Sequence, residues 1–99
     1  MVEPISLLLL LMAGGFAAGA VLALVTWDMV ESWVSARAVR GGYAEILSER
    51  LSTGEYHVVG GVFTPYGVRT ATQAWDARAL DPELARRLRV AGGVIRVHT

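Results

Sequence analysis

The sequence has no cysteine and no lysine. Without cysteine, disulfide bonds and thiolate metal ligands are excluded, and the redox compartment stays open. All nine basic residues are arginine, and nine acidic residues balance them to a net charge of zero. The charge therefore gives no reason to expect a nucleic-acid partner.

The 99 residues allow at most one small domain. Residues 5–26 contain no charged residue, Asn, Gln, His or Pro. Only about 70 residues remain for a folded domain, and a chain of that size buries a modest core. We therefore expect that a membrane or a partner protein contributes to the stability of the domain.

The uncharged run predicts a transmembrane helix over residues 5–26, after a tail of residues 1–4. A helix of that length is about 33 Å long, enough to cross a hydrocarbon core of roughly 30 Å. Trp27 and Trp33 suit the membrane interface. Two alternatives are a buried core helix and a signal peptide cleaved near Ala18-Gly19-Ala20, although no basic residue precedes the run.

Arginine placement predicts the orientation of such a helix. No arginine precedes it, whereas Arg37, Arg40 and Arg50 follow it. By the positive-inside rule, the N-terminus lies outside and the C-terminal domain is cytoplasmic, at the cell membrane.

Small residues dominate the centre of the run. Gly15 and Gly19 form a GxxxG pair. The residues around them are mostly Ala and Gly, so the predicted helix has small side chains on several of its faces. Small residues let helix backbones approach closely in lipid. The predicted helix-packing residues are Gly14, Gly15, Ala18, Gly19 and Ala23. The alternative is a plain Ala/Gly-rich anchor.

Residues 27–42 read as a juxtamembrane amphipathic helix that ends at a Gly41-Gly42 hinge. An apolar stripe from Tyr43 to Leu51 then predicts another helix, ending near Gly54. Hairpin strands are expected at 56–63 and 68–75, joined by a "TPYG" turn.

A short helix is expected after Asp81 as N-cap and Pro82 as first residue, followed by a strand in "VIRVHT". The predicted fold class is thus a single-pass transmembrane α-helix followed by a small α+β domain at 43–99. Its order is α-β-β-α-β, with a three-stranded sheet and helices on one face. Strand edges at 56–63 or 94–98 are candidates for pairing between protomers.

No motif in the sequence predicts a catalytic, metal-binding or phosphate-binding site. His57 and His98 lack the spacing of a metal site, and neither glycine pair, Gly60-Gly61 or Gly92-Gly93, matches a phosphate loop. No nucleophile elbow is present. The sequence therefore predicts no catalytic residue, cofactor or metal, and a protein that is not an enzyme.

The last quarter of the chain is basic. Arg86, Arg87 and Arg89 are expected on the outer face of the short helix, where they could contact lipid headgroups or an acidic partner. The alternative is an ordinary solvated helix face.

These patterns lead to a hypothesis of a non-enzymatic single-pass membrane protein that acts by assembly. It would form a homo-oligomer or serve as a small subunit of a membrane complex, through its Gly/Ala-rich helix. The alternatives are a pore-forming effector built from that helix and a membrane-tethered binding module. The expected partners are membrane lipid, copies of the chain or other membrane-protein subunits, with no nucleic acid and no small-molecule substrate.

Overall fold

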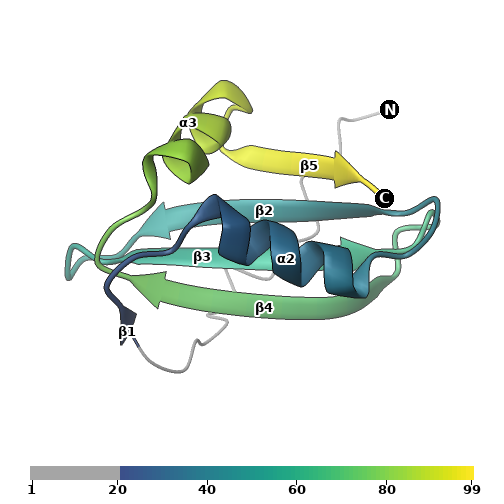
Figure 1. Cartoon of the computed structure of the whole chain (residues 1–99), viewed down its shortest axis with the longest axis horizontal. Helices are drawn as coiled ribbons and strands as arrows, with labels where there is room; N and C mark the ends of the chain where they lie inside the picture. Colours follow the sequence, from purple (N-terminus) through teal and green to yellow (C-terminus); the bar gives the residue numbers. More distant parts are fainter. Residues whose placement is uncertain (1–20) are drawn as a thin grey trace.

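Five strands form one mixed sheet in the order β1-β4-β3-β2-β5. The computed structural model describes residues 21–99 (Figure 1). The strands are β1 (Val21–Leu22), β2 (Tyr43–Arg50), β3 (Tyr56–Phe63), β4 (Arg69–Ala77) and β5 (Val94–His98). The helices are α2 (Trp27–Arg37) and α3 (Pro82–Val90).

Strand pairing is antiparallel for β2 with β3, β3 with β4 and β2 with β5. Only β1 pairs in parallel, with the end of β4. β2 and β3 are therefore interior strands, and β5 is the terminal strand of this order. The expectation that residues 56–63 form a sheet edge is wrong, because β4 and β2 flank them on both sides.

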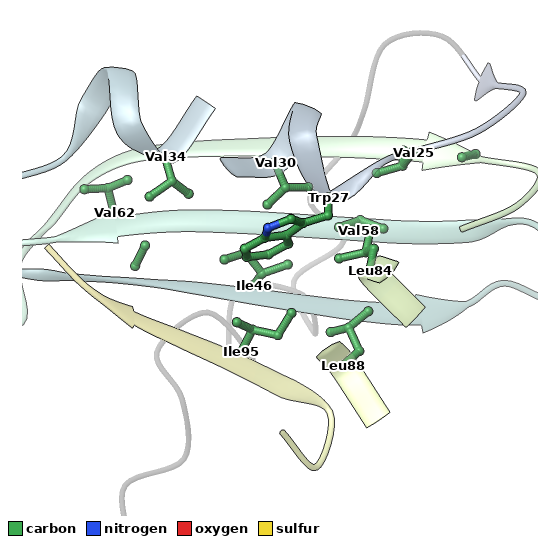
Figure 2. Close-up of a cluster of buried hydrophobic side chains, with 12 residues drawn as sticks. Val25, Trp27, Val30, Val34, Ile46, Val58, Val62, Leu84, Leu88 and Ile95 are labelled. Atoms are coloured by element: carbon green, nitrogen blue, oxygen red, sulfur yellow. The ribbon is translucent and has the colours of Figure 1, made fainter. Parts of the chain in front are cut away.

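Both helices pack on the same face of the sheet. Val30 and Val34 of α2 and Leu84 and Leu88 of α3 belong to one buried cluster with strand residues such as Ile46. Figure 2 shows these side chains converging between the helices and the strands. The main core therefore lies between the sheet and a layer made of α2 and α3 (Figure 1).

A second buried cluster occupies the opposite face of the sheet. Its buried members within residues 21–99 all come from strands: Leu47, Val59, Phe63 and Ala74. Tyr43 stacks on Phe63 beside them, with ring centroids 5.0 Å apart. Apolar residues thus lie on both faces of β2 and β3, as expected for interior strands.

The predicted transmembrane helix over 5–26 is contradicted where the chain is described. Val21–Leu22 is a strand, and Val25 bridges Leu80 with its side chain fully buried. Within residues 21–99, no helix is both long enough and apolar enough to cross a bilayer. The end of the apolar run therefore pairs with the sheet and enters the core, and residues 5–20 of the predicted span lie outside the described residues.

The predicted helix beginning at Tyr43 is also wrong, since this segment is strand β2. Four consecutive residues, from Ala44 to Leu47, are buried because β2 has core on both faces. A strand buried on both sides loses its alternation of apolar and polar residues. A short apolar run of this kind cannot be distinguished from a helix by periodicity alone.

Three local predictions are confirmed. The hairpin strands occur at β3 and β4, α3 begins at Pro82, and the last strand is β5. The turn between β3 and β4 contains Gly67 with a φ of 83°, the positive value that the "TPYG" pattern requires. The three-stranded order is nevertheless wrong, because β1 and β2 extend the sheet to five strands.

Candidate functional site

A pocket with a volume of about 580 Å³ opens where α3 meets the end of the sheet. Four segments form it: the end of β2, the start of β3, the chain after β4, and α3 with the loop that follows it. Its lining residues are Ser48, Arg50, Tyr56, Arg78, Ala79, Leu80, Ala85, Leu88, Arg89, Gly92 and Gly93. Pockets of a few hundred Å³ that combine apolar walls with a few polar groups are typical ligand sites.

Three arginines line the pocket. Arg50 is the last residue of β2, Arg78 follows the last residue of β4, and Arg89 lies in the last turn of α3. All three are exposed, and no Asp or Glu is among the described lining residues. A guanidinium stays protonated at any physiological pH, so this pocket carries positive charge.

None of these three arginines forms an ion pair with a described residue. The ion pairs of residues 21–99 join Arg86 and Arg87 to Glu83, Arg96 to Glu45, and His57 to Asp76. Arg50 instead lies over the ring of Tyr56, with its Cζ atom 5.2 Å from the ring centroid. The pocket arginines are therefore charged donors that no described carboxylate neutralises.

The inner wall of the pocket is apolar. Leu88 is 7% exposed and belongs to the main core, and Leu80 packs against that core. Ala85 on α3 and the ring of Tyr56 at the start of β3 complete the wall. The pocket thus combines a charged rim with an apolar interior.

The loop after α3 keeps one side of the pocket open. Gly92 and Gly93 have φ values of 77° and 104°, and a Cβ atom built on either would meet nothing within 4 Å. Their N–H groups donate to the carbonyls of Arg89 and Leu88 at 3.2 and 2.8 Å. Because these N–H groups cap the helix, the positive charge of the pocket comes from side chains.

The structure separates the three arginines that the sequence placed on one outer face. Arg86 and Arg87 both donate to Glu83, at distances down to 2.8 and 2.7 Å. Arg87 also lies over the ring of Trp27, with Cζ 4.3 Å from the centroid. Arg89 is the one member of this set that lines the pocket.

The two tryptophans predicted at a membrane interface contribute to the folded domain. Trp27 is 9% exposed and belongs to the main core. Trp33 is half-buried and meets Trp75 edge to face. Of the predicted helix-packing residues, Ala23 lies in the bend after β1. The other four, Gly14, Gly15, Ala18 and Gly19, lie outside the described residues.

In the sequence, Arg50 contributed only to the predicted membrane orientation, and no pattern grouped it with Arg78. The two are 28 positions apart, on different elements, and no local motif links them. The only available signal was the basic bias after residue 77, which includes Arg78 and Arg89. Strand pairing and the packing of α3 bring these residues together.

Two other charged pairs lie across neighbouring strands. His57 contacts Asp76 between β3 and β4, and Glu45 contacts Arg96 between β2 and β5. In each pair the two residues lie directly opposite each other on neighbouring strands, so the contact stabilises the observed register of the strands. Across residues 21–99, no three His, Asp or Glu side chains come together in a way that could hold a metal ion.

Comparisons of the chain with protein families, with curated proteins and with solved structures found no match.

Proposed function

We propose that this protein is a non-enzymatic binding module that takes an anionic ligand into the pocket formed by α3 and the ends of β2 and β4. The observation that carries the proposal is the set of three arginines on one pocket, with no described carboxylate paired to any of them. Arginine is well suited to phosphate and carboxylate groups, because its planar fork donates two parallel hydrogen bonds.

The described lining of the pocket is better suited to binding than to nucleophilic catalysis. The pocket holds no histidine, no carboxylate and no potential nucleophile except Ser48 and Tyr56 among its described lining residues. No described base is paired with either hydroxyl. General-base activation of a nucleophile needs such a partner within hydrogen-bond distance.

Self-association through the Gly/Ala-rich segment remains a separate prediction. The residues that carry it, apart from Ala23, lie outside the described residues. The binding proposal does not depend on it, because the pocket is complete within one copy of residues 21–99.

The proposal is tested by titrating the full chain with hexyl phosphate and, as the uncharged control, with hexanol. Hexyl phosphate should shift the amide NMR signals of Gly92 and Gly93, and hexanol should bind much more weakly. Arg50→Gln, Arg78→Gln and Arg89→Gln should each weaken phosphate binding at least about tenfold, since a hydrogen bond to a charged group contributes roughly 1.5–3 kcal/mol.

The matched control is Arg69→Gln, which removes an exposed arginine at the opposite end of β4. It should leave the affinity within about twofold, because the charge at this distance is screened. Equal affinity for hexanol and hexyl phosphate would overturn the proposal. So would equal losses in the Arg69 variant and the three pocket variants.

A further inference from the structure

We infer that the ligand of this pocket is an amphiphilic phosphate monoester, with an alkyl or aryl body against the apolar wall and the phosphate at the arginines. The inference rests on the proposed anion-binding function and adds the chemical class of the ligand. It follows from the charge at the rim, the size of the pocket and the character of its inner wall.

The charge at the rim favours a phosphate monoester over a carboxylate. A monoester carries a charge of about −1.5 to −2 at neutral pH and offers three strong acceptor oxygens. A carboxylate carries one charge and two oxygens. Three guanidinium groups, from Arg50, Arg78 and Arg89, are better matched by the group with more charge and more acceptors.

The size of the pocket argues against an inorganic anion as the natural ligand. A water molecule takes about 30 Å³ of liquid, so an anion with five heavy atoms would fill roughly a quarter of the pocket. The pocket measures about 580 Å³. The remaining space would keep apolar side chains in contact with water, and a ligand with an apolar body removes that contact.

The inner wall shows where such a body would lie. Leu80, Ala85 and Leu88 line the pocket, and of these Leu88 belongs to the main core and Leu80 packs against it. Tyr56 also lines the pocket, and the guanidinium of Arg50 lies over its ring. The inferred ligand would set its aryl group or alkyl chain against these apolar lining residues and its phosphate at the arginines of the same pocket.

The test is a calorimetric series of methyl, butyl and hexyl phosphate with the full chain in detergent-free buffer, because detergents are themselves amphiphiles. Affinity should rise about fourfold for each added methylene until the wall is covered, as expected from about 0.8 kcal/mol per buried methylene. Methyl phosphate should bind weakly, and its binding should still depend on Arg78.

Two variants separate the wall from the rim. Ala85→Gln places a polar side chain on the wall, and glutamine is a good helix former, so α3 should persist. It should lower the affinity for hexyl phosphate at least tenfold and leave methyl phosphate within about twofold. Leu80→Ala, which shortens the wall without adding polarity, should flatten the dependence on chain length.

The possible outcomes distinguish this inference from the proposed function. If all three phosphates bind equally tightly, the amphiphile inference fails and anion binding stands. If none binds, the proposed function fails as well. Vesicles of phosphatidylcholine with phosphatidylglycerol, whose anionic headgroup is a phosphodiester, test for attraction to a charged surface alone. Binding to these vesicles without binding to soluble hexyl phosphate would assign the charge to a lipid surface and overturn the pocket inference.

Discussion

Trp33 and Trp75 meet edge to face above Gly60, with ring centroids 5.8 Å apart and an interplanar angle of 88°. Trp33 belongs to α2, Trp75 to β4 and Gly60 to the interior strand β3. A Cβ atom at residue 60 would lie 3.3 Å from Trp33 and 3.4 Å from Trp75. The absent side chain is what allows both rings to lie over the strand.

Gly60→Val should therefore destabilise the domain by about 1–3 kcal/mol, the usual cost of adding bulk to a packed site. Urea denaturation measures the change in unfolding free energy, and near-UV circular dichroism should report altered packing of the tryptophans. The control is Gln73→Val on the neighbouring strand, where the exposed side chain lies directly opposite Gly60. A stable Gly60→Val protein with an unchanged near-UV spectrum would contradict this reading.

Asp81 connects the starts of the two helices. Its carboxylate accepts a hydrogen bond from the backbone N–H of Trp27 at 3.3 Å and makes no capping bond to its own helix. Asp81→Ala should cost about 1 kcal/mol of unfolding free energy, the typical net value of one hydrogen bond. Asp81→Asn retains an acceptor oxygen and should stay close to the wild type. Equal stability of the two variants would show that this bond contributes nothing.

Glu83 should titrate below its ordinary pKa of 4.5. The hydrogen bond from Arg86 is the largest cause of the lowered pKa. Desolvation opposes it as the second-largest effect, and the hydrogen bond from Arg87 and the charges of both arginines lower the pKa further. Since the folded-state pKa is depressed, the stabilisation is present above pH 4.5 and is lost as the pH falls through the lower, folded value. Carboxyl NMR titration should show the pKa rising towards 4.5 in Arg86→Gln and unchanged in Arg89→Gln. A wild-type pKa at or above 4.5 would contradict the ion-pair geometry.

Thr64 orders the turn between β3 and β4. Its Oγ1 accepts hydrogen bonds from the N–H groups of Tyr66 and Val68, at 3.2 and 3.1 Å. Thr64→Val keeps the shape but removes the acceptor, so the unfolding free energy should fall by about 1 kcal/mol. Thr64→Ser keeps the hydroxyl and should lose clearly less. The measurement is urea denaturation of both variants, and a serine variant as unstable as the valine variant would show that the hydroxyl is not what orders the turn.

Elements specified by nearby residues were predicted well. α3 follows from Pro82 and the glycines after Val90, and the β3–β4 turn follows from Pro65 and Gly67. Asp81 shows the limit of such reasoning: the residue stands at the N-cap position, but its side chain bonds to Trp27, 54 positions away. A local pattern identifies the position of a residue and leaves its long-range partner undetermined.

The fold and the candidate site depend on contacts that no local pattern encodes. β2 was mistaken for a helix because the two buried clusters cover both of its faces, which removes the alternation of apolar and polar residues. The end of the apolar run was assigned to a membrane because hydrophobicity alone does not distinguish lipid from a protein core. At Val25 the structure shows a protein core, because this side chain is fully buried and its backbone forms a bridge with Leu80.

Residues close together in the chain specify the turns, the boundaries of α3 and the excess of arginine near the C-terminus, so these features can be predicted from the amino-acid order. Long-range folding is needed to place five strands in one sheet and Arg50, Arg78 and Arg89 in one pocket. This difference arises because backbone pairing and the burial of apolar side chains act between residues tens of positions apart. They bring together charges whose order in the sequence carries no sign of their proximity.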